Sequence, residues 1–266
     1  MNQDQASKRA VLSHSGVIDA RSLETSHMRL AEILAPGMTV LDVGCGTGAI
    51  THGIARAVGP TGQVIGVDYN PELIAKARHN YEGIPGLSFE TGDIYRLPYQ
   101  DRFHVVTCAR VLQWLADPGK ALGQMVQSAR SGGTVLVLDY NHEKIEWHPQ
   151  IPEAMVNFYA AFLRWRKDAG MDNKIADHLA GLFEQQGLSR IRVTAQHETA
   201  LRGAPDFDSH TLIWAGVASF KGVQMVQDGY MEESERAVAE EQYRKWAAGQ
   251  AEFQKMYLLS VEGIKP

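Results

Sequence analysis

The sequence predicts an α/β fold in which a mostly parallel sheet is covered by helices. Short apolar runs rich in β-branched residues alternate with segments of helical character, and this alternation is typical of a doubly wound sheet. With 266 residues, of which 44% are hydrophobic, the chain can bury one substantial core. The strands that we expect are Thr39–Val43, Val64–Val67, Leu87–Glu90, Val105–Ala109 and Val135–Leu138.

Capping residues and prolines mark the helices between these strands. Asn70-Pro71 and Asp117-Pro118 each place a capping side chain before a proline at the first helical position. Gly132-Gly133 is expected to end the second of these helices. Ligands of doubly wound sheets bind outside the carboxyl ends of the strands, so we expect function in the loops that follow the five strands.

Charge and composition narrow the choice of partners. The formal net charge is -5, which indicates no broad basic face and disfavours a nucleic-acid partner. No stretch approaches about 18 uninterrupted apolar residues, and the first residues lack the apolar core of a signal peptide. We therefore expect no membrane partner, a cytoplasmic location and a small-molecule partner. The two cysteines are too few for a disulfide framework or a zinc cage.

A glycine-rich loop follows the first strand. Asp42 precedes Gly44, Gly46 and Gly48, which have the spacing G-x-G-x-G. Glycines let a ligand lie against the main chain without meeting a Cβ atom. The fingerprint of a dinucleotide site is instead G-x-G-x-x-G, and a tight turn without any ligand is the remaining alternative.

This loop resembles the first motif of the class I S-adenosylmethionine-dependent methyltransferases, in which an acid and an apolar residue precede G-x-G-x-G. The resemblance covers about Leu30 to Asn141 and is greatest to the small-molecule branch that includes the ubiquinone and menaquinone biosynthesis methyltransferases. It implies a Rossmann-like, seven-stranded sheet whose last strand is antiparallel, with S-adenosylmethionine as cofactor. Asp42 would order the loop or act through water near the methionine ammonium. The residues under the amino-acid end of the cofactor would be Gly44, Cys45, Gly46 and Thr47.

Acids at the ends of the second and third strands suit a nucleoside. Asp68 can accept hydrogen bonds from both ribose hydroxyls and Tyr69 can pack on the adenine, although this spacing also fits a dinucleotide and an exposed Asp is common at a strand end. The resemblance implies that Asp93, after Gly92, takes the adenine amino group while the Ile94 amide faces a ring nitrogen. The alternative is that Asp93 only caps a turn.

The segment after the fourth strand completes the expected cofactor site. The resemblance places Ala109 and Arg110 under the cofactor, with Gln113 and Trp114 at the boundary between cofactor and substrate. Packing in the core is the alternative for Trp114. Because Cys108, Ala109 and Arg110 offer no carboxylate to a hard cation, we expect no metal.

The remaining chain is assigned to the substrate side. We expect a helical lid in residues 1–30 and a methyltransferase domain in residues 31–266, with cap insertions at about 142–172 and 200–250. An acidic helix is expected at Glu232–Ala248 and the last strand within residues 253–266. The oligomeric state is expected to be a monomer or a homodimer.

An aromatic stripe in the first cap insertion is the expected substrate pocket. After Pro152, Phe158, Phe162 and Trp165 recur at helical spacing and would roof a cavity. The alternative is that this helix is wholly buried in the core or in a subunit interface.

The implied chemistry is an in-line displacement of methyl from a sulfonium, for which alignment in a dry pocket is the main task. If the acceptor loses a proton, a base must take it. The candidates are His14, His142 and His148. Tyr140 and Asn141 lie where the family commonly contacts substrate, and Tyr140 is also assigned a catalytic role.

The sequence therefore predicts an enzyme that transfers methyl from S-adenosylmethionine to an oxygen, nitrogen or carbon atom of a small molecule, in secondary or quinone-type metabolism, and releases S-adenosylhomocysteine. One alternative keeps the cofactor site but catalyses a non-methylating reaction such as cyclisation. A second alternative is a non-catalytic sensor or partner subunit.

Overall fold

Seven strands form the main sheet of the computed structural model, which describes residues 5–6, 8–9 and 19–266. In chain order they are β1 (Thr39–Val43), β2 (Gln63–Asp68), β3 (Leu87–Thr91), β4 (Phe103–Ala109), β5 (Ala129–Tyr140), β7 (Ser189–Ala195) and β10 (Leu258–Ile264). Their order across the sheet is β3-β2-β1-β4-β5-β10-β7. The first five pair in parallel, whereas β10 is antiparallel to both of its neighbours. The expected fold class is therefore confirmed.

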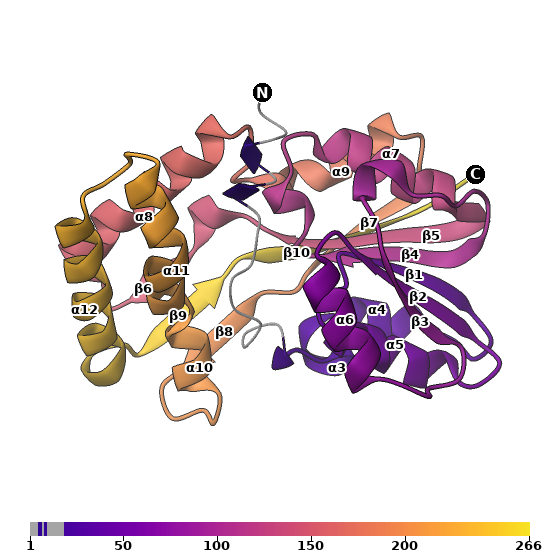
Figure 1. Cartoon of the computed structure of the whole chain (residues 1–266), viewed down its shortest axis with the longest axis horizontal. Helices are drawn as coiled ribbons and strands as arrows, with labels where there is room; N and C mark the ends of the chain where they lie inside the picture. The colour runs from indigo at the N-terminus through magenta and orange to yellow at the C-terminus, as the bar shows by residue number, and fades with distance from the viewer. Residues whose placement is uncertain (1–4, 7, 10–18) are drawn as a thin grey trace.

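Helices cover both faces of this sheet (Figure 1). They are α3 (Leu23–Ser26), α4 (Met28–Ile33), α5 (Ala49–Val58), α6 (Pro71–Asn80), α7 (Pro118–Ser128) and α9 (Ile175–Gln185). α7 and α9 pack on one face in a cluster with Leu41, while α3, α4 and α5 pack on the other face with Val40. Consecutive strand residues point to opposite faces, so this alternation gives the sheet two separate cores.

Both expected helix starts are present. The Asn70 side chain accepts a hydrogen bond from the Glu72 amide at 2.9 Å, and the Asp117 side chain accepts one from the Lys120 amide at 2.9 Å. Each helix has its proline in the first turn. These caps satisfy amide groups that no intrahelical carbonyl can reach.

The expected end of α7 is wrong. α7 ends at Ser128, because Ala129 is already extended (φ -69°, ψ 141°) and begins β5. Gly132, at φ 73°, and Gly133 lie inside β5 instead, where the pairing with β4 shifts register. A Cβ atom on Gly133 would lie 2.8 Å from the Phe103 carbonyl oxygen. The glycines therefore serve a bulge in the strand rather than a helix end.

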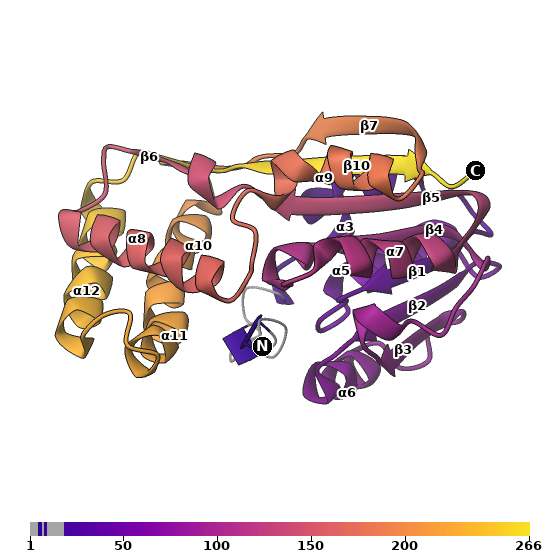
Figure 2. The same cartoon turned by 90° about the horizontal axis from the view of Figure 1, so that it is seen from above.

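A second group of elements forms a helical lobe beside the main sheet (Figure 2). We define the helical lobe as α8 (Glu153–Asp168), α10 (Phe207–Thr211), α11 (Ile213–Gln227), α12 (Glu233–Gly249) and a small sheet of β6 (Glu146–His148), β9 (Phe253–Met256) and β8 (Glu198–Leu201). α12 confirms the expected acidic helix. The three long helices share one hydrophobic cluster, so the lobe has its own core. Within the described residues, no helix combines the length and apolarity needed to cross a membrane.

The last strand of the sequence serves two sheets. Residues 253–266 read as one strand, but the chain is interrupted at Tyr257, with β9 in the small sheet and β10 in the main sheet. The Tyr257 carbonyl accepts a hydrogen bond from the Asn141 amide at 2.9 Å, just beyond β5. The lobe is thus joined to the end of β5, where sheets of this kind bind ligands.

Candidate cofactor and substrate site

The glycine loop is held against the end of β2. The amides of Gly44 and Cys45 both donate to the Val67 carbonyl oxygen, at 2.7 and 3.1 Å. A Cβ atom on Gly44 would lie 2.4 Å from a methyl carbon of Val111, and one on Gly48 would lie 2.6 Å from the Phe89 ring. Both glycines also have positive φ angles. Contacts within the protein therefore require glycine at these two positions, whether or not a ligand also lies against the loop.

Asp42 is buried beneath this loop. Its carboxylate accepts a hydrogen bond from the Thr51 hydroxyl of α5 at 2.7 Å. Burial raises the pKa of Asp42 to about 6, against the opposing effect of the Thr51 hydrogen bond. Asp42 therefore ties the end of β1 to the helix that follows the loop, as expected for a loop-ordering role. Thr47 is also buried in the loop.

Asp68 joins the first two strand ends. Its carboxylate accepts hydrogen bonds from the Gly46 amide at 2.8 Å and from the Asn70 amide at 2.9 Å. Burial raises the pKa of Asp68. A carboxylate has about four acceptor positions, so two backbone bonds leave capacity for ribose hydroxyls. Tyr69, next to it, is 70% exposed, so its ring is accessible to a ligand.

The loop after β3 lies next to Asp68. The Gly92 amide donates to the Asp68 carbonyl oxygen at 3.0 Å. Asp93 is the N-cap of the 3-10 helix η1 (Ile94–Arg96) and accepts from the Tyr95 amide at 2.9 Å. Asp93 therefore does cap this turn. The contact of Asp93 and Ile94 with adenine stays a prediction.

The loop after β4 contains a strained, buried arginine. Arg110 has a φ of 63°, a region that few non-glycine residues adopt, and follows the partly buried Ala109. Its side chain donates to the Tyr140 hydroxyl at 3.0 Å and to the Ser26 carbonyl oxygen at 3.0 Å, and it forms an ion pair with Glu198. The guanidinium thus points toward the helical lobe, while the backbone of this loop stays the predicted cofactor contact.

Tyr140 is fully engaged by this ion pair. Its hydroxyl donates to Glu198 at 3.0 Å and accepts from Arg110. Burial and the Glu198 charge raise the pKa of Tyr140 to about 12. These contacts disfavour the expected catalytic role, because a phenol that donates to a carboxylate is held in its protonated form. The geometry supports a positioning role instead.

Gln113 and His142 form a buried pair after β4 and β5. The Gln113 side-chain amide donates to the Arg110 carbonyl oxygen at 3.1 Å, so its oxygen faces His142, whose Nε2 lies 2.6 Å away. Because that oxygen can only accept, His142 carries its hydrogen on Nε2. Burial and the Arg166 charge lower the pKa of His142 well below its usual value. His142 is therefore neutral, with Nδ1 free of hydrogen-bond partners among the described residues.

Two of the other expected substrate-side residues have structural partners. The Asn141 side chain donates to Asp177 at 2.8 Å and accepts from the Glu143 amide at 2.8 Å, where it caps the 3-10 helix η3 (His142–Lys144). His148 is on β6, with a side chain that is 72% exposed and 3.5 Å from Glu252. An open position of this kind does not desolvate a reacting base. His14 lies outside the described residues.

The aromatic stripe of α8 lies in the core of the helical lobe. Phe158, Phe162 and Trp165 are wholly or almost wholly buried. The Phe162 ring centroid is 5.9 Å from that of His142 and 5.5 Å from that of Trp214. This burial favours the core alternative, and their contact with substrate stays a prediction.

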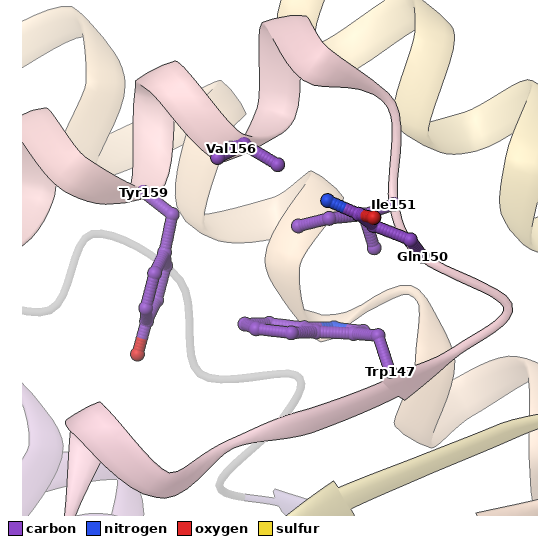
Figure 3. Close-up of a pocket in the computed structure, with 5 residues that line it drawn as sticks. All are labelled: Trp147, Gln150, Ile151, Val156 and Tyr159. Atoms are coloured by element: carbon purple, nitrogen blue, oxygen red, sulfur yellow. The ribbon is translucent and has the colours of Figure 1, made fainter.

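Another face of α8 borders a pocket of about 220 Å³ (Figure 3). The residues that line it are Trp147, Gln150, Ile151, Val156 and Tyr159. Tyr159 also donates its hydroxyl to the His142 carbonyl oxygen. Tyr159 therefore contacts both the pocket and the loop after β5.

Trp114, in the 3-10 helix η2 (Leu112–Trp114), lies between the sheet and the lobe. The Arg166 guanidinium carbon is 4.7 Å from the centroid of its ring and the Lys221 ammonium nitrogen is 5.3 Å away. Such cations stabilise an indole ring through its electron-rich face. Trp114 therefore lies between the loop after β4 and α8, and its place at the boundary between cofactor and substrate stays a prediction.

Sequence reasoning missed several residues of this site. Arg166 of α8 and Glu198 of β8 both reach the loop after β4. Burial, together with the nearby charge of Arg110, lowers the pKa of Arg21. All three residues read in the sequence as ordinary surface charges. No local signal marks a charge that tertiary packing buries.

Metal ligands and disulfides were also expected to be absent. Within the described part of the chain, no three His, Cys, Asp or Glu side chains are grouped as metal ligands would be. Cys45 and Cys108 are buried free thiols.

A model of the methyltransferase domain family matches residues 34–187, which is more than half of the chain. The chain belongs to the methyltransferase domain family. The resemblance drawn from the glycine loop and the strand-end acids is thereby confirmed. The matched range includes β1 to β5 with all of their following loops.

Curated relatives of this methyltransferase-family chain include demethylmenaquinone methyltransferases. The chain is 37% identical over 124 residues to an uncharacterized methyltransferase of Schizosaccharomyces pombe. The aligned region covers 43% of this chain and 44% of the relative. The chain is 27% identical over 176 residues to the demethylmenaquinone methyltransferase of Lysinibacillus sphaericus, covering 60% and 74%. The chain thus spans less than half the length of the first of these relatives.

Solved structures share the fold at low identity. Phosphoethanolamine N-methyltransferase 2 from Haemonchus contortus, in complex with phosphomonomethylethanolamine and S-adenosylhomocysteine, is 16% identical with a TM-score of 0.62, covering 100% of this chain and 60% of that one. The cyclase SpnF is 19% identical with a TM-score of 0.55, covering 93% and 84%. These likenesses concern the fold alone, and one fold can host more than one reaction.

Proposed function

We propose that this protein transfers a methyl group from S-adenosylmethionine to a small-molecule acceptor and releases S-adenosylhomocysteine. The observation that carries the proposal is the hydrogen bond from the Gly46 amide to Asp68. It joins the glycine loop to the acid at the end of β2, so the predicted contacts for the amino-acid end and the ribose are adjacent. Family membership supports the same cofactor.

The cofactor would extend along the strand ends from β1 to β4. We propose that Asp68 binds the ribose hydroxyls, that Asp93 and Ile94 bind the adenine, and that Ala109 and Gln113 border the reactive end. Alignment of the sulfonium with the acceptor and exclusion of water supply most of the rate in such a displacement. The dense packing around Gln113 and His142 suits that exclusion.

The acceptor that we propose is a small ring compound of quinone-type or secondary metabolism. The relative from Lysinibacillus sphaericus is by name a demethylmenaquinone methyltransferase. Aromatic rings surround His142, with centroids of Tyr140 at 5.5 Å and Trp214 at 6.1 Å. We further propose a cytoplasmic monomer or homodimer that acts without a metal and without nucleic acid or membrane partners.

The direct test is calorimetric titration with S-adenosylmethionine, S-adenosylhomocysteine and NAD in parallel. We expect micromolar binding of both sulfur ligands and none of NAD. Mass spectrometry of a metabolite extract incubated with methyl-labelled cofactor should then show a labelled product. Binding of NAD alone would contradict the proposal.

The cyclase SpnF, which has the same fold, suggests how to interpret cofactor binding without methyl transfer. Cofactor binding without a labelled product from any acceptor would favour a non-methylating reaction such as cyclisation, or a non-catalytic sensor. The strand-end motifs report cofactor binding and do not distinguish these cases.

A further inference from the structure

The pocket beside α8 is formed by one short part of the helical lobe. Its five lining residues all lie between residues 147 and 159, on β6, on α8 and on the connection between them. None of the five belongs to the loops that follow β1 to β5, where the cofactor is predicted to bind. Figure 1 and Figure 2 both show β6 and α8 in the lobe, well apart from β1, β2 and β3. The pocket is therefore a separate candidate for ligand binding.

Two aromatic rings shape this pocket (Figure 3). The Trp147 ring lies across one side, and the Tyr159 ring stands next to it, with 5.2 Å between the ring centroids and 80° between the ring planes. Aromatic rings favour offset stacking and edge-to-face contacts. A planar ring that lies on Trp147 would therefore meet Tyr159 edge to face at the same time. An aliphatic ligand would gain only the apolar contact.

The rest of the lobe holds both rings in position. The Trp147 backbone is paired with Gln254 of β9. The Tyr159 hydroxyl donates to the His142 carbonyl oxygen, and the Tyr159 ring centroid is 4.8 Å from that of Trp214. Because neither ring has to be ordered when a ligand binds, less binding free energy is lost to ordering than on a mobile surface.

The size and chemistry of the pocket favour a small, uncharged ligand. The volume is about 220 Å³, and a cavity of about 150 Å³ is enough to hold benzene. Ile151 and Val156 present aliphatic surface opposite Trp147, and Gln150 contributes a side-chain amide. None of the described residues that line the pocket is charged. One ring or two fused rings with a single polar group fit this space.

We propose that this pocket binds an uncharged aromatic molecule of one or two rings, which stacks on Trp147 and places a polar group near the Gln150 amide. A charged ligand would be unfavourable here, because the described lining offers no opposite charge to compensate its loss of water. The site is independent of the predicted cofactor site. The inference therefore does not rest on the proposed methyl transfer.

Nuclear magnetic resonance of protein with nitrogen-15 in its tryptophan indoles tests this site. The chain has five tryptophans, and the Trp147→Phe variant assigns the Trp147 signal. We expect 2-naphthol to shift that signal saturably. Naphthalene-2-sulfonate, which has the same rings with a negative charge, and cyclohexanol, which is not aromatic, should each bind at least tenfold more weakly. Equal binding of either control, or no saturable shift with 2-naphthol, would overturn the proposal.

S-adenosylhomocysteine distinguishes this site from the cofactor site. We expect the affinity for 2-naphthol, measured at Trp147, to change less than twofold when the protein is saturated with S-adenosylhomocysteine. Displacement of 2-naphthol would show that the two ligands share one site, which contradicts the proposal. If S-adenosylhomocysteine itself does not bind, the proposed function fails, while the Trp147 titration still decides this inference.

Two matched variants locate the binding. Val156→Glu introduces a charge into the pocket at a position that is already 38% exposed, and Val223→Glu makes the same change on α11, where Val223 is 42% exposed. We expect Val156→Glu to weaken 2-naphthol binding at least tenfold, because the ring would have to desolvate the new carboxylate. Val223→Glu should leave the affinity unchanged within twofold. A folded Val156→Glu variant with undiminished 2-naphthol binding would rule the site out.

Discussion

Two aspartates at neighbouring strand ends have different tasks because their surroundings differ. Asp42 is buried and its carboxylate is occupied by Thr51 of the helix after the loop. Asp68 is only partly buried, and two backbone amides orient it toward the open ends of the strands. The first residue therefore stabilises the site, and the second is the better candidate for contact with a ligand.

Replacing Asp68 should weaken cofactor binding. We expect Asp68→Ala to cost about 1–3 kcal/mol in the free energy of S-adenosylmethionine binding, the usual cost of a lost hydrogen bond to a charged group. Calorimetric titration measures this directly. Glu82→Ala removes an exposed carboxylate beyond α6 and is the matched control. Unchanged affinity in Asp68→Ala would disprove the ribose assignment.

Asp42 should make stability depend on pH. Its pKa is raised to about 6 by burial, so the folded state holds the proton more tightly than the unfolded state, in which an Asp titrates near about 3.9. The stabilising contribution is therefore complete below about pH 4 and is lost as the pH rises through 6. At about 1.4 kcal/mol per pKa unit, the loss is at most about 3 kcal/mol.

Urea unfolding of wild type and Asp42→Asn between pH 4 and 7 measures this effect. The free energy of unfolding of wild type, relative to the variant, should decrease as the pH rises. A difference that stays constant over this interval would show that Asp42 titrates normally.

At the scale of elements, two glycines flank α5 for different reasons. Gly48 is the N-cap of α5, and the Phe89 ring of β3 occupies the space that a Cβ atom there would need. The same helix ends at Gly59, which also has a positive φ, but a Cβ atom there would meet no other atom of the described residues within 4 Å. The N-cap glycine is thus required by backbone and packing together, and the C-cap glycine by backbone alone.

Alanine substitutions should separate these two causes. Gly59→Ala should cost about 1–3 kcal/mol, because its backbone (φ 69°, ψ -176°) lies in a region that is essentially restricted to glycine. Gly48→Ala should cost more and should also weaken S-adenosylmethionine binding, because either Phe89 or the loop must move. Thermal and urea unfolding of both variants provide the comparison. Equal destabilisation would contradict the role of the Phe89 contact.

The elements that the sequence assigned incorrectly depend on long-range pairing. In the sequence, the Gly132-Gly133 pair indicates the end of a helix. In the structure, these glycines form a bulge in β5, which exists because β5 pairs with β4 on one side and with β10 on the other. The interruption at Tyr257 likewise follows from the pairing of β9 with β6 and β8. The partner strands β10, for β5, and β6 and β8, for β9, are all distant in sequence, so local patterns could not place these boundaries.

At the scale of the whole molecule, an ion pair between the buried Arg110 and the partly buried Glu198 connects the main sheet to the helical lobe. Arg110 follows β4, Glu198 lies on β8, and Tyr140 at the end of β5 bonds to both. Because the site lies at this junction, the pair both stabilises the fold and fixes the loop that is predicted to contact the cofactor.

Removing the charge of Glu198 should destabilise the protein strongly. Glu198→Gln leaves the Arg110 charge buried without its carboxylate, and we expect a loss of about 3 kcal/mol or more in the free energy of unfolding. Glu241→Gln breaks the exposed pair with Lys245 and should cost less than about 1 kcal/mol. Urea unfolding of both variants is the measurement. A Glu198→Gln variant as stable as Glu241→Gln would refute the role of the buried pair.

Local patterns in the chain were enough to predict the doubly wound sheet, the glycine loop, the acids at the strand ends and the family. A strand, a turn and a cap each depend on a few consecutive residues, so these features can be read in order along the sequence. The burial of Arg110 and Arg166, and the hydrogen bond from Tyr140 to Glu198, emerged only from the folded chain. Burial and charge pairing arise when segments far apart in the chain meet, and together they set the pKa values of the buried groups.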